Sequence, residues 1–129
     1  MTIKECYTKL GGDYDTAIRA ISKESRIEKI LKMLPKDKSM DALRSALEQK
    51  DFDAAFRASH TLKGVFLNLC LSRQAKAAID LTDALRQQKE ASEISALFTQ
   101  LEQSYNEMLR ILKEFVDEQA TVGEEHEKK

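Results

Sequence analysis

Apolar residues recur at steps of three and four along almost the whole chain, and this spacing limits the possible folds most strongly. The clearest run covers about six helical turns and consists of Ile94, Leu97, Leu101, Tyr105, Met108, Leu112 and Phe115. Such spacing places side chains on one face of an α-helix, whereas a half-buried strand alternates from residue to residue. The 129 residues include four glycines and one proline, too few for the many tight turns of an all-β fold. We therefore expect an all-α domain.

The spacing predicts four longer helices, all of them after residue 38. They are expected at about Ser39 to Lys50, at about Phe52 to Leu71 with Asp51 as its cap, from Ser72 to Arg86, and from Ser92 past Phe115. The segments between them are short, and short connections favour antiparallel neighbours. The predicted architecture is an antiparallel, up-down four-helix bundle.

One or two short helices are expected before the bundle. Asp13 could cap the first, and Ser25 with Glu28 forms a capping-box pattern for the second. Pro35 should end or kink that helix, because proline lacks the N–H and clashes with the preceding turn. We expect residues 1–35 to pack on a bundle formed by residues 36–119, and the polar residues 120–129 to form a flexible tail.

Charge and cysteine content exclude several functional classes. The formal net charge is −1, so we expect no binding to nucleic acid or to a membrane surface. No apolar run approaches the length of a membrane span, the N-terminus has no secretory pattern, and a cytoplasmic protein is the simplest expectation. Cys6 and Cys70 are far apart in sequence, which does not suit a disulfide framework or a zinc site. We expect a monomer, because the length suffices for a core of its own.

His60 lies in the predicted helix at 52–71 but off its apolar face. On a helical wheel it falls about 120° from the centre of the core line, which consists of Phe52, Ala55, Phe56, Ser59, Leu62, Phe66 and Leu69. His60 should therefore be exposed, with Lys63 and Gly64 beside it one turn further on. A glycine inside a helix costs about 0.8–1.0 kcal/mol relative to alanine. A sequence accepts that cost where another group must approach the backbone closely.

The surroundings of His60 are basic and partly apolar. Residues 54–79 contain no Asp or Glu, and their charged side chains are Arg57, Lys63, Arg73 and Lys76. Leu67 falls on the same flank as His60, so the patch is typical of a docking surface for another protein. Taken singly, each feature has a simpler interpretation: a lone exposed histidine is usually an ordinary surface residue, and a glycine within a helix often serves close helix packing.

The stretch from His60 to Gly64 (HTLKG), followed by Asn68 and Leu69, resembles the signature of histidine-containing phosphotransfer (Hpt) domains of two-component phosphorelays. The resemblance covers residues 36–117 and is most specific over 51–86. It implies a left-handed four-helix bundle with the phosphoryl group carried on His60. It also implies that Lys63 lies beside the phosphoryl oxygens and that Gly64 leaves room for the partner.

The chain departs from the family pattern at Thr82. Many members have Gln or Glu at the position 22 residues after the histidine, where its side chain bonds the other ring nitrogen. The shorter Thr82 is thus a possible orienter of His60, and a water or a backbone carbonyl could take its place.

The expected function is that of a phosphoryl carrier. Neutral His60 would attack the aspartyl-phosphate of a receiver domain and later pass the group to a second receiver. The partners expected are response-regulator receiver domains or a hybrid sensor kinase. Six side chains around the motif are expected to contact them: Arg57, Thr61, Leu67, Asn68, Arg73 and Lys76. The sequence has no Gly-rich nucleotide loop and no acidic cluster near His60. The chain is therefore expected to be no enzyme and to hold no cofactor, with Mg²⁺ bound by the receiver.

Two alternatives come from other classes. The chain could be a helical adaptor that binds receiver or kinase domains without being phosphorylated. It could also be a structural helical bundle with no phosphoryl chemistry, in which case changes at His60, Lys63 and Gly64 would affect stability alone.

Overall fold

The computed structural model describes the backbone of residues 1–127 and the side chains of residues 1–119. Over these residues the chain is all-helical, without strands, and the predicted fold class is confirmed. The elements in order are α1 (Ile3–Leu10), α2 (Tyr14–Ile21), α3 (Glu24–Met33), the 3-10 turn η1 (Leu34–Lys36), α4 (Ser39–Glu48), α5 (Phe52–Asn68), α6 (Ser72–Arg86) and α7 (Ala91–Glu127).

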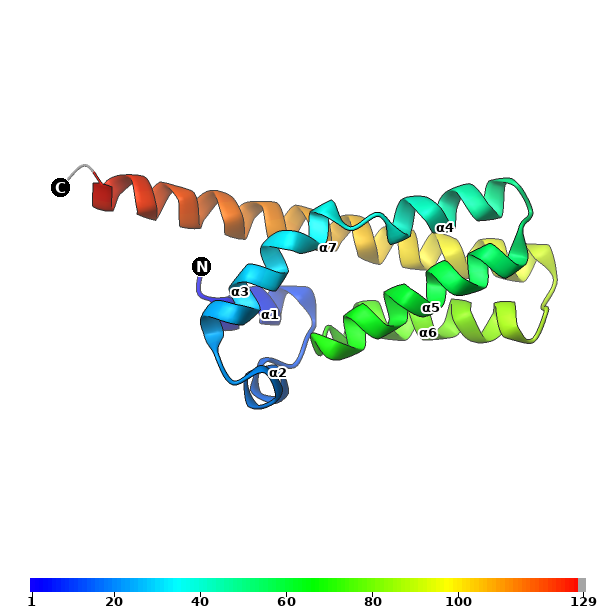
Figure 1. Cartoon of the computed structure of the whole chain (residues 1–129), viewed down its shortest axis with the longest axis horizontal. Coiled ribbons are helices and arrows are strands. Elements are labelled where there is room, and N and C mark those ends of the chain that lie inside the picture. The colour runs from blue at the N-terminus through cyan, green and yellow to red at the C-terminus, as the bar shows by residue number, and fades with distance from the viewer. Residues whose placement is uncertain (128–129) are drawn as a thin grey trace.

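Helices α4 to α7 form the predicted up-down bundle, in which consecutive helices run in opposite directions (Figure 1). Helix α5 packs against both α4 and α6, and α6 packs against α7. The centre of the bundle is apolar, and its fully buried side chains include Leu43, Leu62, Phe66, Leu81, Leu101 and Met108. Burial of these side chains is the main favourable term in the stability of such a bundle.

Two local sequence signals, one at the start of α5 and one at the end of α3, have the expected effect. The Asp51 carboxylate accepts a hydrogen bond of 3.1 Å from the Ala54 N–H and so caps α5. Helix α3 ends at Met33, and Pro35 lies in the 3-10 turn that follows it. The placement of Phe52 on the core line was wrong, because its side chain is 43% exposed. Phe52 is the first residue of α5, so its side chain lies at the end of the helix and not in its packed middle.

Three helices precede the bundle, not one or two, because α1 was not predicted. Thr2 and Glu5 form a capping box at its start, and Gly11 ends it in the left-handed conformation with φ 74°. Asp13 caps α2 as expected. The capping box predicted at Ser25 is wrong: α3 begins at Glu24, and no side chain caps it.

Hydrogen bonds join the N-terminal helices to the turn between α5 and α6. The Tyr7 hydroxyl donates to the Leu69 carbonyl at 2.8 Å, and the Asp13 N–H donates to the Cys70 carbonyl at 2.8 Å. The buried Gln74 amide donates to the Leu10 carbonyl at 3.1 Å. These bonds lie at the end of the bundle opposite to the start of α5 (Figure 1).

Helix α7 is 37 residues long and extends well past the other helices of the bundle (Figure 1). The tail predicted at 120–129 lies partly within it, since the helix continues to Glu127, and residues 128–129 lie outside the described part of the chain. No helix in the described range is both long and apolar enough to cross a membrane.

Candidate functional site

His60 lies in the middle of α5 on its outer face. The neighbouring Ser59 and Leu62 are buried against the other helices, whereas the imidazole of His60 is exposed to solvent. The expectation that His60 faces away from the core is therefore confirmed. Among the residues whose side chains are described, none donates or accepts a hydrogen bond with this imidazole, so its ring nitrogens are open to a reaction partner.

An aromatic contact supports the imidazole from one turn earlier in α5. The rings of Phe56 and His60 stack with centroids 5.9 Å apart and planes 13° apart. The Arg86 guanidinium of α6 lies 5.8 Å from the centroid of the Phe56 ring, a cation–π distance, and is paired with Asp83 at 3.1 Å. The stacking of Phe56 on His60 was not predicted from the sequence, although their four-residue separation on one helix could have indicated it.

Thr82 does not take the place expected for it beside His60. Its side chain is fully buried, and its hydroxyl donates to the Ala78 carbonyl at 2.7 Å. A second hydrogen bond of 2.6 Å joins it to the hydroxyl of Ser59, which points into the core. Thr82 therefore faces the inner side of α5, while His60 is on the outer side. The ring of Phe56 stacks on the His60 imidazole.

Lys63 and Gly64 lie one turn beyond His60, as expected from the sequence. Lys63 is half-buried, and its ammonium has no acidic partner in the described part of the molecule. Apart from the backbone of its own helix and its chain neighbours, a Cβ atom placed on Gly64 would meet no atom of the described residues within 4 Å. Helix packing within the chain thus does not require this glycine, which removes that interpretation and leaves a bare patch of backbone beside the imidazole.

The structure divides the six expected partner contacts into two groups. Arg57, Thr61, Leu67 and Asn68 are exposed on α5, like His60. Arg73 and Lys76 are exposed at the start of α6, in a shallow hollow between α6 and α7 whose lining includes Gln100 and Ser104 and no residue of α5. Lys76 is also paired with Asp80 at 3.0 Å. These two basic side chains therefore border a hollow to which the helix of His60 contributes no residue.

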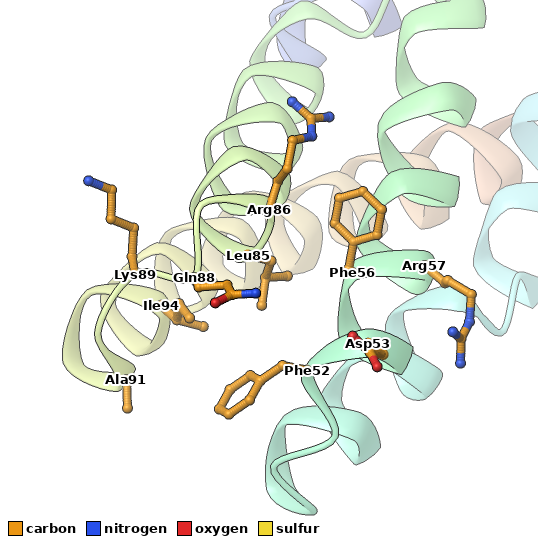
Figure 2. Close-up of a pocket in the computed structure, with 10 residues that line it drawn as sticks. All are labelled: Phe52, Asp53, Phe56, Arg57, Leu85, Arg86, Gln88, Lys89, Ala91 and Ile94. Carbon is orange, nitrogen blue, oxygen red and sulfur yellow. The ribbon is translucent and has the colours of Figure 1, made fainter.

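A larger hollow of about 580 Å³ lies at the start of α5 (Figure 2). Phe56, whose ring stacks on His60, is one of the residues that line it. Its lining comes from α5, from the end of α6, from the turn between α6 and α7, and from the start of α7. The residues are Phe52, Asp53, Phe56, Arg57, Leu85, Arg86, Gln88, Lys89, Ala91 and Ile94. We call it the Phe52 pocket. It was not expected from the sequence, because it depends on how the ends of three helices are placed.

Acidic and metal-binding groups are sparse around His60. In the described range, no group of three or more His, Cys, Asp or Glu side chains is arranged to hold a metal ion. Cys6 and Cys70 are free, and burial raises the pKa of the Cys6 thiol to about 11. Both cysteines lie at the end of the bundle joined to the N-terminal helices, away from the Phe52 pocket.

Comparison with protein families gives one match, to the model described as the Hpt domain, over residues 35–111. This match covers more than half of the chain and includes the whole of α4, α5 and α6. The chain belongs to the Hpt domain family. Hpt domains are phosphocarrier modules of two-component systems that interact with receiver domains and kinases. No curated protein and no solved structure matched the chain. Helices α1 to α3 of this Hpt domain precede the matched region.

Proposed function

We propose that this Hpt domain is a phosphorelay intermediate that accepts a phosphoryl group on His60 from the aspartyl-phosphate of one receiver domain and passes it to another. The observation that carries the proposal is the position of His60 within the family match: exposed in mid-helix, free of hydrogen bonds from the described side chains, with Lys63 and the bare Gly64 on the next turn.

The transfer step needs little from the chain itself. A lone pair on an unprotonated imidazole nitrogen forms the N–P bond, while the P–O bond to the aspartate breaks and its electrons return to the receiver's carboxylate. The imidazolium proton leaves to solvent. Transfer to the second receiver reverses these bond changes. The Lys63 ammonium offsets negative charge on the phosphoryl oxygens as they pass between the two residues.

The remaining groups come from the partner in this proposal. The receiver supplies Mg²⁺ and the residues that activate its aspartate, and this chain acts as substrate and carrier. Gly64 allows the receiver to approach closely, because no side chain projects from the helix there.

A reconstituted relay tests the proposal. A receiver domain phosphorylated with acetyl phosphate is mixed with Mg²⁺, this chain and a second receiver, and phosphate is followed on all three proteins. We expect passage to the second receiver with the wild type and with His126→Gln, the matched control at the other histidine, and none with His60→Gln. Binding of the receivers without phosphate on any variant would contradict the proposal and indicate the adaptor.

A further inference from the structure

The Phe52 pocket has apolar walls open to solvent. Phe52 is 43% exposed, and Figure 2 shows its ring pointing away from α5, toward the turn that carries Gln88 and the start of α7 at Ala91. Leu85 and Ile94 contribute further apolar surface from α6 and α7. Large exposed apolar side chains that border a hollow are typical of a surface that a partner covers.

The rim of the pocket is mainly basic. Arg57, Arg86 and Lys89 line it together with a single acidic residue, Asp53. Arg86 is paired with Asp83, whereas Arg57 and Lys89 have no ion pair with any described side chain. This local excess of positive charge occurs on a chain whose formal net charge is −1. The pocket therefore favours a partner surface that combines an apolar side chain with acidic neighbours.

The pocket is continuous with the phospho-acceptor site through one side chain. Phe56 lines the pocket and also stacks on His60, with 5.9 Å between the ring centroids. A domain that brings an aspartate to His60 buries about 800 Å² of this chain in a typical interface, which is enough to cover Phe56 and the pocket that it lines. The occupant of the pocket is then supplied by the same domain that exchanges phosphate.

We propose that the Phe52 pocket receives an apolar side chain flanked by acidic residues, supplied by the receiver domain that docks on His60, and thereby determines which receivers this chain serves. The proposal rests on the proposed function. It assigns Phe52 a recognition role remote from the reacting atoms, with Lys89 and Arg57 providing the attraction for the acidic neighbours.

The test compares two phosphoryl donors. Receiver domains from the same genome are phosphorylated with acetyl phosphate, and the one that transfers fastest to the wild type is used as the protein donor. Phosphoramidate is the small donor, because it phosphorylates an accessible histidine with release of ammonia and needs no docking surface. The quantity measured is the ratio of kcat/KM for the receiver to the rate constant with phosphoramidate.

Phe52→Ser is expected to lower this ratio about tenfold, mainly through KM, because loss of a buried interface anchor costs at least this much. Lys89→Glu should lower it at low salt and less at 0.5 M NaCl, since an interfacial charge is screened. Met33→Ser is the matched control. Its side chain is 59% exposed on α3, away from the pocket, and its ratio should equal that of the wild type.

Each outcome decides a separate point. A ratio for Phe52→Ser equal to that of the wild type would overturn the pocket proposal while leaving the carrier function intact. If phosphoramidate labels the wild type and no receiver transfers to it, the proposed function fails, and the pocket proposal fails with it. Circular dichroism and thermal unfolding of Phe52→Ser establish that the exposed substitution leaves the fold unchanged.

Discussion

The rings of Phe56 and His60 lie nearly parallel on one face of α5, 13° apart in plane and 5.9 Å between centroids. Members of the family often hold the histidine through a hydrogen bond from a Gln or Glu on the next helix. In this chain Thr82 occupies that position, and its hydroxyl is hydrogen-bonded in the core to the Ser59 hydroxyl and the Ala78 carbonyl. Stacking on Phe56 restricts the orientation of the imidazole instead, since a flat neighbour permits fewer ring rotations than solvent does.

Replacement of Phe56 tests this positioning role. Phe56→Leu removes the ring, so the imidazole protons of His60 should move toward the chemical shifts of an unstructured histidine, and receiver-dependent phosphorylation should slow several-fold. Phe56→Tyr keeps an aromatic ring and should retain both properties. Two-dimensional NMR of the histidine ring protons measures the effect directly. Unchanged His60 shifts in Phe56→Leu would show that the stacking does not persist in solution.

Gly64→Ala should have opposite effects on stability and on transfer. A Cβ at position 64 meets no described residue outside its own helix backbone and chain neighbours within 4 Å, so alanine gains its helix propensity without a clash, about 0.8–1.0 kcal/mol. The methyl group would project into the space that the receiver must enter, and transfer should slow. Urea unfolding and receiver-dependent phosphorylation measure the two effects. Transfer at the wild-type rate would show that no close approach occurs at Gly64.

Tyr7→Phe tests whether the N-terminal helices are an integral part of the domain. The Tyr7 hydroxyl donates to the buried Leu69 carbonyl at 2.8 Å, so its removal should lower the free energy of unfolding by about 1–3 kcal/mol. Tyr105→Phe is the control, because the Tyr105 hydroxyl has no hydrogen bond with a described residue and its loss should cost little. Equal stability of the two variants in urea would contradict the conclusion that the hydrogen bond from Tyr7 holds α1 against the bundle.

Stability at alkaline pH should depend on Cys6. Burial raises the pKa of this thiol from its ordinary value of 9.0 to about 11. Between these values the unfolded chain releases the proton and the folded chain keeps it, so the contribution of Cys6 to stability is complete below pH 9 and falls as the pH rises toward 11. Urea unfolding at pH 8 and pH 10 should therefore show a smaller loss of stability for Cys6→Ala than for the wild type. An equal loss would mean that water reaches the thiol.

The bundle helices were predictable because each carries a long apolar face, as in α7 from Ile94 to Phe115. Helix α1 was not predicted, although Ile3, Cys6, Tyr7 and Leu10 are buried. A helix of eight residues is unstable alone and depends on contacts such as the bond from Tyr7 to Leu69. The error at Phe52 has a related cause. A helical wheel treats every turn of a helix as equally buried by its neighbours, whereas Phe52, in the first turn of α5, is exposed.

The candidate site was predictable as far as one helix determines it. The positions of His60, Lys63 and Gly64 follow from their spacing on α5. The inward direction of Thr82, the contact of Arg86 with Phe56 and the walls of the Phe52 pocket depend on how α6 and α7 are rotated against α5. No local pattern specifies that rotation, because it is set by packing of the complete bundle.

Mapping the phosphate after reaction with a phosphorylated receiver tests the central claim most directly. Trypsin cleavage after Arg57 and Lys63 releases residues 58–63, which contain His60 and no other histidine. The account predicts acid-labile, base-stable phosphate on this peptide in the wild type and in His126→Gln, and its loss in His60→Gln. Phosphate that persists in His60→Gln, or a wild type that stays unmodified while it binds the phosphorylated receiver, would contradict the account.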